Sequence, residues 1–501
     1  MVGAPADAAP APAPRLRREL GVVGLAATGI CSMVGAGINI VPFAIQRTVP
    51  GIADWVLPAY AIAAVPAVLA ALCYAALGSA MPRAGGSYVY ASRAINAHAG
   101  FLASFSQWFG LCMAIGVVAY VIPPFLRDIA VAAGWQGMAS ALGAPPVRLA
   151  LALALLWTFV LVNLRGVEAV ARTLLPLMVL MFVCGAMVIV TGATHEPGET
   201  LARLLPQEGA RALDAPPRGG FWQVVPAGAA VLFSSFIGFD AIAQAGGEAR
   251  NPSRNIPLAV GAAIVTVGVF YLAFTAAVYH AVPWQVVADA SRRGDVTAPG
   301  LLTPLVSAPV ALLMVSGAAV SLINDLPGML LGVSRLCFAW AEDGVFPAGL
   351  AAVHPRHRTP HVALGVSALL ATGSVLGGHF ANDFFVGVDI LVTAMLVNFL
   401  MMAVALLRLP SRNPALAAEL RLLRTRGAQR AVAIPAIVLL GALLVAQTWR
   451  DLSAPGAWYA HPTWIWVVVM GVGGAIHWRE VRGLHARGID LSARTAVLPA
   501  E

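Results

Sequence analysis

Long apolar segments recur along the whole chain, and this pattern limits the possible fold more than any other feature. A helix needs about 20 apolar residues to cross the hydrocarbon core of a bilayer. Twelve segments meet or approach that length, at about 22–46, 53–80, 100–126, 148–165, 170–192, 222–246, 257–280, 303–336, 361–379, 384–407, 431–448 and 461–477. Only 11% of the 501 residues are charged, against about 25% in a water-soluble domain. The sequence therefore predicts an all-α polytopic membrane protein with twelve transmembrane helices.

The polar stretches between these segments are too short to fold separately, so we expect a single transmembrane domain over residues 21–480. Residues 1–20 are rich in alanine and proline and end in arginines, which indicates a disordered cytoplasmic tail. The apolar run that follows exceeds the core of a secretory signal, about 7–15 residues, and is typical of a first membrane helix. Residues 481–501 are expected to form a second cytoplasmic tail.

The basic residues, all of them arginine, are distributed unevenly between the two sides that the segments define. Of 31, 22 fall on the side of the N-terminus, Arg335 among them as a loop residue, and 9 on the other. Positively charged loops stay in the cytoplasm, so both termini are predicted to be cytoplasmic, in the inner membrane of a bacterium. Arginines placed between apolar segments indicate orientation in a lipid bilayer, and no nucleic-acid partner is expected.

Several kinds of site have no support in the sequence. The five cysteines lie within or at the edges of apolar segments and form no close pair, so neither a disulfide framework nor a metal site is expected. The sequence contains no G-x-x-x-x-G-K-[ST] loop, no H-E-x-x-H and no G-x-S-x-G. The sequence therefore does not indicate transport driven by ATP hydrolysis within this chain, an enzyme activity or a bound cofactor.

Glycines interrupt two of the apolar segments at corresponding places. Gly35, Ala36 and Gly37 lie in the first segment and Gly238 in the sixth, five segments later. Helix breaks at matching positions of two halves mark the substrate site of many secondary transporters, because unwound backbone must line a cavity. The alternative is that these glycines only allow close helix packing. Their paired positions favour the site.

The chemistry of unwound backbone indicates what such a site would bind. Free N–H groups at the N-terminus of a half-helix suit a carboxylate. Free carbonyl groups suit an ammonium group or a cation. An α-amino acid carries both charges on one carbon, so the breaks predict an amino-acid transporter.

Five motifs carry a resemblance to a known family. They are VGAGIN, MPRAGGSYVYASRA, NLRGVEAVAR, FIGFDAIAQAGGEARNPSRNIPLAV, and SRLCFAWAEDGVFP followed by HPRHRTP. In this order they resemble the amino acid–polyamine–organocation superfamily of permeases, over roughly residues 20–410. The resemblance implies the leucine-transporter fold, with inverted repeats of five helices each at about 21–192 and 222–407. Two extra helices would follow at about 431–477.

The resemblance also implies where the substrate binds, between the broken first and sixth helices near Gly238. The substrate carboxylate would meet backbone amides near Gly35, Ala36 and Gly37. Its amino group would meet carbonyl groups near Ile30 and Phe236. The third and eighth helices would line the pocket for the side chain.

Three positions depart from the pattern of the family. Asn39 stands where a phenylalanine is usual, and Ser234 where some exchangers carry a gating tryptophan. Met181 aligns with a lysine that some proton-coupled members carry in the fifth helix. A lysine-based coupling mechanism is therefore not expected in this chain.

Three acidic residues inside apolar segments, Asp240, Asp325 and Asp389, need a role because burying a carboxylate costs about 2.5–3.5 kcal/mol on insertion scales. Asp240, two residues after Gly238, fits either a cap on a half-helix or a role in binding substrate or proton. Asp389 is expected to be a gate or rim residue near the outer face. Asp325, beside Asn324, is the main candidate for coupling, because it matches the depth of the coupling-ion site in the leucine-transporter fold. The alternative is a structural partner within the bundle.

Together these features predict a secondary active transporter that takes up an amino acid, coupled to a proton or to sodium. An amino-acid or polyamine exchanger is an alternative, which would need internal substrate for uptake. A membrane sensor that binds an amino acid without moving it is an alternative of another class. It would bind ligand in detergent and fail to transport in proteoliposomes.

Overall fold

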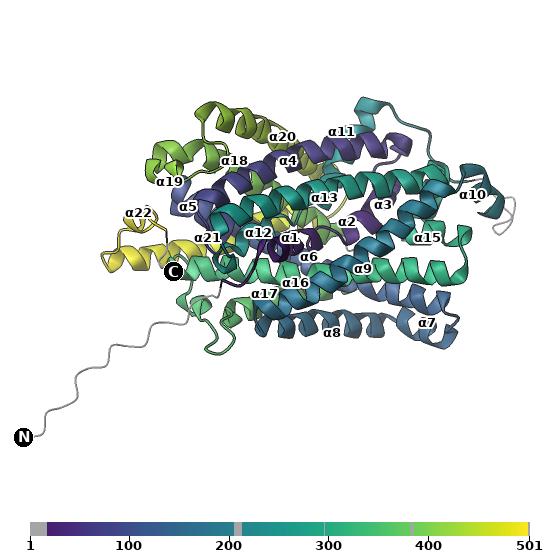
Figure 1. Cartoon of the computed structure of the whole chain (residues 1–501), viewed down its shortest axis with the longest axis horizontal. Helices are drawn as coiled ribbons and strands as arrows, with labels where there is room; N and C mark the ends of the chain where they lie inside the picture. The colour runs from purple at the N-terminus through teal and green to yellow at the C-terminus, as the bar shows by residue number, and fades with distance from the viewer. Residues whose placement is uncertain (1–17, 205–212, 295, 382–384, 499–501) are drawn as a thin grey trace, which may run out of the picture.

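The computed structural model describes residues 18–204, 213–294, 296–381 and 385–498. These residues form helices that pack side by side, mostly along the long axis of the molecule (Figure 1). Within the described ranges, strand-like pairing is limited to two isolated bridges, Leu20 with Ala249 and Ala84 with Ala245. The expected all-α class is confirmed for this part of the chain.

Ten stretches among the described residues are long and apolar enough to cross a membrane. They are Ala53–Ala80, Ala97–Ala132, Pro145–Leu164, Val167–Thr194, Phe221–Gln244, Pro252–Ala281, Ala308–Glu342, His361–Phe380, Val386–Arg412 and Arg426–Ser453. The first predicted span is divided among short helices, and the last corresponds to α21 (Pro462–Ala486). The chain is a multi-pass membrane protein, whereas the count of twelve spans and the inverted repeat stay predictions.

Long single helices make up most of the bundle. They are α4 (Val56–Ala80), α6 (Ala97–Ala132), α8 (Pro145–Leu164), α9 (Val167–Thr194), α13 (Pro252–Ala281), α16 (Ala308–Glu342), α17 (His361–Ala381), α18 (Phe385–Arg412) and α20 (Arg426–Ser453). Shorter helices connect them: α5 (Gly86–Ala94), α7 (Gln136–Gly143), α10 (Pro197–Leu204), α14 (Trp284–Arg293), α15 (Ala298–Leu302), α19 (Pro414–Ala418) and α22 (Leu491–Arg494). Figure 1 shows α19, α22 and the C-terminus at one end of the bundle and α10 and α15 at the other.

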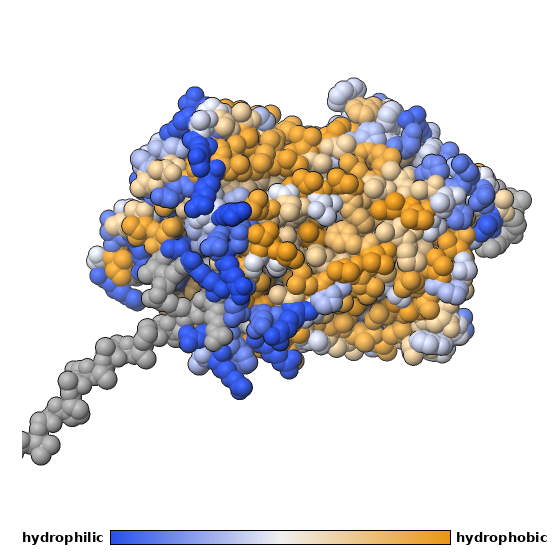
Figure 2. Space-filling model, viewed as in Figure 1, coloured by the Kyte–Doolittle hydropathy of each residue, from blue (hydrophilic) through white to orange (hydrophobic). Residues whose placement is uncertain are grey.

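The outer helices present apolar side chains to the surroundings. Examples are Val179, Val183 and Val190 on α9, Val265 and Val269 on α13, and Val438 and Val445 on α20. In Figure 2 an apolar band lies across the middle of the molecule between two hydrophilic ends. Soluble monomers rarely expose contiguous apolar patches of this kind, whereas the hydrocarbon core of a bilayer favours them.

Small residues allow the central helices α6, α17 and α18 to approach closely. Gly110 of α6 faces Leu391 and Ala394 of α18, and a Cβ atom at Gly110 would lie 2.6 Å from the Ala394 Cβ. Gly116, two turns later, faces α17 in the same way. Membrane helices associate through such van der Waals contacts, because lipid supplies no hydrophobic drive between them.

The eighth predicted span is placed differently from our expectation of 303–336. The helix α16 begins at Ala308 and continues to Glu342. Arg335 lies inside this helix with none of its surface exposed, so its assignment to a loop was wrong. Its charge is matched by Glu248, more than eighty residues away in sequence, and hydropathy alone does not reveal such a partner.

Candidate functional site

The first membrane segment is unwound where its glycines predict a break. α1 (Val22–Cys31) ends before the break, and α2 (Ala36–Asn39) and α3 (Val41–Thr48) continue the segment after it. The turn between them is held locally, because Met33 N–H and Val34 N–H both donate to the Ile30 carbonyl, at 3.1 and 2.9 Å. Gly35 N–H donates to the Met33 carbonyl at 3.2 Å. Gly35 and Ala36 therefore lie at the N-terminal end of a half-helix.

The sixth segment is broken in the same manner. α11 (Phe221–Phe233) passes into a short 3₁₀ turn, Ser234–Phe236, and the chain resumes as α12 (Asp240–Gln244). Gly238 lies between them with φ of +135°, a backbone conformation that residues with a Cβ rarely adopt. A Cβ atom at this position would also collide with the Ser32 carbonyl group. The two breaks therefore touch, and Gly238 is one point of contact.

A second contact joins the two broken segments at Gly37. A Cβ atom at Gly37 would lie 3.0 Å from the Ser235 Cα. The Gly37 carbonyl accepts hydrogen bonds from the Ser235 hydroxyl at 2.8 Å and the Tyr60 hydroxyl at 3.3 Å. The glycines predicted from sequence are thus brought together in space, although they belong to segments about two hundred residues apart.

The two carbonyl groups expected to hold an amino group lie close to the same breaks. The Ile30 carbonyl already accepts the two N–H groups of the turn. The Phe236 side chain is buried, with its ring centroid 5.6 Å from Tyr60 and 5.7 Å from Tyr271. The Tyr271 hydroxyl donates to the Met33 carbonyl. Aromatic rings therefore enclose the breaks from the side of α4 and α13.

Asp325 of α16 lies directly against the break in the first segment. Only 3% of its surface is exposed, and a Cβ atom at Gly35 would collide with its carboxylate. Asn324 extends from the same turn of α16, and its Nδ2 lies 2.9 Å from the Cys31 Sγ. The Asn324 Oδ1 is buried and has no hydrogen-bond partner among the described residues. Asp325 thus lies against the unwound turn, and Asn324 contacts Cys31 at the end of α1.

Asp240, in contrast, belongs to a polar network on the side of α5 and α6. Its carboxylate accepts hydrogen bonds from Gly238 N–H at 3.2 Å and from the Gln107 side chain. Gln244 Nε2 in turn donates to Gln107 Oε1 at 3.1 Å and to the Ser87 hydroxyl at 3.2 Å. The arrangement favours the role of Asp240 as a support of the half-helix, although the N-cap position itself is Phe239.

The network contains residues that we did not identify from the sequence. Ser87 and Gln107 are buried, as is Gln244. Gln107 lies alone in an apolar stretch of α6, and an isolated amide in such a stretch is a signal that could have been used. Ser87 belongs to the MPRAGGSYVYASRA motif, and the Gly85 N–H of that motif donates to the Gln244 carbonyl at 3.2 Å.

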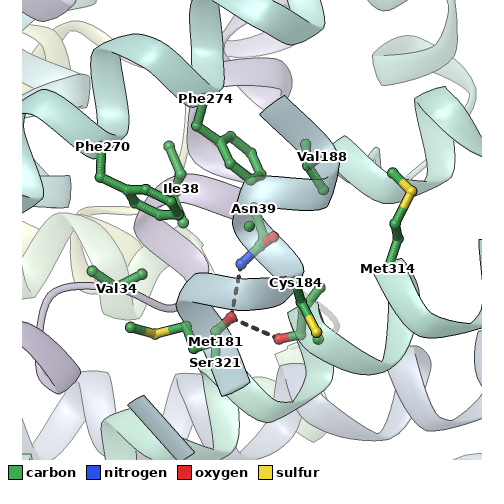
Figure 3. A pocket seen from close by; sticks show the side chains of 13 residues that line it. Val34, Ile38, Asn39, Met181, Cys184, Val188, Phe270, Phe274, Met314 and Ser321 are labelled. Carbon is green, nitrogen blue, oxygen red and sulfur yellow. Dashed lines mark hydrogen bonds between the residues drawn. The ribbon is translucent and has the colours of Figure 1, made fainter. Parts of the chain in front are cut away.

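A pocket lies beside the first break. Two of the three residues that depart from the family pattern, Asn39 and Met181, line it. It encloses about 260 Å³ of empty space, part of it open to the surroundings, between the first segment, α9, α13 and α16. Met181 and Asn39 both line it, together with Ser321 and a set of apolar side chains (Figure 3). Asn39 Nδ2 donates to the Ser321 hydroxyl at 2.8 Å and to the Gly35 carbonyl at 3.0 Å. The family resemblance associates the position of Met181 with a coupling lysine. In this chain Met181 is instead part of the apolar lining of the pocket.

Buried ion pairs close the bundle at the end that carries the C-terminus. Arg335 contacts Glu248 through two hydrogen bonds, of 2.7 and 3.1 Å. Leu20, just before α1, donates its N–H to the Glu248 carbonyl at 2.9 Å and accepts from Arg250 N–H at 2.8 Å. The segment before α1 is therefore hydrogen-bonded to the loop after α12, next to the buried ion pair of Arg335 and Glu248.

A second buried cluster lies at the same end, between α5 and the end of α16. Asp343 accepts hydrogen bonds from Arg93, at 2.5 and 3.0 Å, and from the Tyr88 hydroxyl at 2.8 Å. Burial, followed by the adjacent charge of Asp343, raises the pKa of Tyr88 well above its ordinary range. Tyr88 therefore acts only as a neutral hydrogen-bond donor at physiological pH.

Asp389 lies apart from the breaks. Its carboxylate contacts Arg450 of α20 and accepts a hydrogen bond of 2.9 Å from Gln447. About a third of each ionic side chain is exposed, as expected for a residue at the rim. The prediction of a gate or rim role stays a prediction.

Comparison with known proteins agrees with the motifs. A family model described as amino acid permease matches residues 20–473. An uncharacterized transporter of Mycobacterium tuberculosis is 29% identical over 378 residues, covering 74% of this chain and 77% of its own. The branched-chain amino acid permease of Bacillus subtilis is 27% identical, covering 70% and 72%. The methylthioribose transporter of the same species is 23% identical, covering 90% and 91%.

The family model spans nearly the whole chain, two of the five motifs lie at the two breaks, and the relatives are named as transporters and permeases. Neither the family nor these relatives are enzymes. The chain therefore belongs to the amino acid permease family of multi-pass membrane transporters.

Proposed function

We propose that this permease takes up an amino acid across the inner membrane of a bacterium by secondary active transport, together with a proton. The substrate would bind at the contact between the two broken segments, with Gly35, Ala36, Gly37 and Gly238 around it. The observation that carries the proposal is the position of the Asp325 carboxylate, which lies against Gly35 at the start of a half-helix.

The first turn of a helix attracts negative charge, because its first N–H groups have no partner within the helix. In the structure Asp325 lies at this end of α2. The carboxylate of an amino acid bound to the backbone at Gly35 to Gly37 would come close to Asp325. Two carboxylates side by side in a site of low dielectric repel one another strongly, unless one of them takes up a proton.

This repulsion supplies a mechanism for coupling. Substrate binding favours protonation of Asp325, and by linkage protonation of Asp325 favours substrate binding to the same degree. Substrate and proton would then move together, and release of one would promote release of the other. Met181 cannot carry a proton, which leaves Asp325 as the acidic group nearest the break in the first segment.

The amino group of the substrate would bind the carbonyl groups of Ile30 and Phe236. The Ile30 carbonyl is occupied by the turn at residues 33 and 34 in this structure. Binding would therefore require the turn to loosen, as expected of backbone that changes partners during alternating access. Asn324 Oδ1 is buried and has no hydrogen-bond partner in the part of the chain that the structure describes. It could accept a hydrogen bond from protonated Asp325 or from substrate.

Replacing Asp325 with asparagine keeps the size of the side chain and removes its titration. In proteoliposomes, Asp325→Asn should abolish accumulation driven by a pH gradient, while counterflow exchange of labelled substrate continues. The substrate is first identified by the thermal shift that each of the twenty amino acids produces, since a ligand that binds only the folded state raises its stability. Methylthioribose and a polyamine belong in the same screen.

Asp451→Asn is the matched control, because it neutralises another carboxylate of a membrane helix, α20, whose partners His461 and Thr463 lie outside both broken segments. It should retain accumulation driven by the pH gradient. Undiminished accumulation by Asp325→Asn would show that Asp325 is a structural residue. Uptake that requires sodium would make Asp325 a cation ligand, uptake only with internal substrate would indicate an exchanger, and binding without any transport would indicate a sensor.

The proposed orientation has its own test, with both termini on the cytoplasmic side. The native cysteines are all buried, so single exposed cysteines can be introduced without their interference. Arg487→Cys lies between α21 and α22, and Glu199→Cys lies in α10 at the opposite end of the bundle. In intact cells an impermeant thiol reagent should label the cysteine at 199 and spare the one at 487. The reverse labelling would invert the topology.

A further inference from the structure

Two of the family motifs, NLRGVEAVAR and HPRHRTP, take no part in the transport site and meet at a separate pocket. This pocket lies at the junction of α8 and α9, against the loop that leads into α17. It encloses about 420 Å³ of empty space that is partly open to solvent. Its lining consists of Glu19, Arg165, Gly166, Val167, Glu168, Arg356, His357 and Arg358.

The backbone of the two motifs is locked in place around the pocket. The Thr359 hydroxyl donates to the Leu164 carbonyl at 3.1 Å, which ties the loop to the end of α8. His354 N–H donates to the Thr359 carbonyl at 2.8 Å, and Arg358 N–H to the His354 carbonyl at 2.9 Å. Arg358 is held at a φ of +55°, which is uncommon for a residue with a side chain. Such strain often marks a residue placed for function.

The charged side chains around the pocket give it an excess of positive charge. Arg165, Arg356 and Arg358 form no ion pair among the residues that the structure describes. The Glu168 carboxylate forms an exposed ion pair with Arg172 at 2.6 Å. Glu19 also has an interaction partner. Desolvation, and then the charges of His357, His361 and Arg356, lower the pKa of His354 beside the pocket. The N-terminus of α9, a helix of 28 residues, adds its positive dipole end at Val167, while the Gly166 N–H already donates to the Asn163 carbonyl at 3.2 Å.

The group that this arrangement fits is a phosphate. Arginine guanidinium groups bind phosphate oxygens in pairs of parallel hydrogen bonds, and the N-terminus of a helix binds the same group through its N–H donors. A carboxylate would satisfy only part of this set of donors. The pocket is partly open to solvent, so a charged group can enter it.

The surroundings of the pocket identify the source of the phosphate. Leu161, one turn before the end of α8, is 55% exposed, and Leu369 on α17 is 62% exposed. Both residues belong to long membrane helices, and an apolar band lies across the middle of the molecule (Figure 2). Basic pockets between membrane helices at the membrane surface are suited to anionic headgroups. We infer that this pocket binds the headgroup phosphate of an anionic phospholipid, with its acyl chains along α8 and α17.

The test compares binding to the purified full-length protein in detergent. The ligands are short-chain phosphatidylglycerol, short-chain phosphatidylcholine and inorganic phosphate, and the readouts are the shift in Tm and native mass spectrometry. Phosphatidylglycerol should stabilise the protein at concentrations where phosphatidylcholine does not. In the triple variant Arg165→Gln, Arg356→Gln, Arg358→Gln its apparent Kd should rise at least about tenfold, as expected for the loss of charge-assisted hydrogen bonds.

A matched triple variant removes three positive charges at another place on the side predicted to be cytoplasmic. Arg412→Gln, Arg424→Gln, Arg430→Gln changes three exposed arginines that do not line the pocket, and it should bind phosphatidylglycerol like the unmodified protein. Equal loss in both triple variants would overturn the site, since net charge alone would then explain binding. Stabilisation by inorganic phosphate at the same concentration would overturn the assignment to a lipid. Arg356→Gln alone, at an exposed position, replaces the triple variant if that variant fails to fold.

Discussion

Gly238→Val should abolish substrate binding and transport while the protein still inserts into the membrane. Gly238 has φ of +135°, and a valine held there would be strained by about 1–3 kcal/mol. Its Cβ would also collide with the Ser32 carbonyl group and press on Met33 of the first break. Every 1.4 kcal/mol reduces the population of an arrangement tenfold, so uptake should fall by at least about ten- to hundredfold. Initial uptake rates, normalised to the amount of protein in the membrane, measure the effect.

Gly268→Val is the matched control for this change. Gly268 lies within α13 with open space around it, so the same side chain there should leave uptake close to that of the unmodified protein. Gly37→Val should show an intermediate loss, because a Cβ at Gly37 lies 3.0 Å from Ser235 without a positive φ. Full transport by both Gly238→Val and Gly37→Val would rule out a substrate site at the contact between the breaks.

Arg335→Ala should destabilise the protein by about 3–5 kcal/mol, because it leaves the buried carboxylate of Glu248 without its cation. Both side chains are almost completely buried and joined by two hydrogen bonds. The backbone carbonyl of Glu248 also accepts the N–H of Leu20, so displacement of Glu248 should loosen the end of the bundle where the segment before α1 is tied down. Unfolding by SDS in mixed micelles measures the free energy, and hydrogen exchange of residues 20–31 measures the loosening.

Arg172→Ala is the control for this prediction. It breaks the exposed pair with Glu168, whose side chains are 76% and 62% exposed, and exposed pairs contribute about 0–1 kcal/mol. The double variant Arg335→Leu, Glu248→Leu should recover much of the stability, since apolar residues often replace a buried ion pair without loss. Equal stability of Arg335→Ala and Arg172→Ala would mean that the buried pair does not hold this end closed.

The class of protein and the place of the breaks could be predicted from the sequence, because both depend on local properties. The length of each apolar segment decides whether it can cross a bilayer, and only glycine tolerates the backbone at Gly238. The motifs indicated the family for the same reason, because each motif is a short contiguous run of residues. Segment ends were less certain, as the extension of α16 past residue 336 shows.

The partners of the buried charges were decided only by the tertiary structure. Asp325 contacts Gly35, Arg335 contacts Glu248, and Asp240 joins Gln107, each across a long separation in sequence. Which side chains meet depends on the rotation and depth of each helix within the bundle, and these follow from the packing of all helices together. Sequence alone determined that this chain is a membrane transporter with two broken helices. The folded bundle decided that an acidic side chain lies at the first break, because only packing sets the face that α16 presents to it.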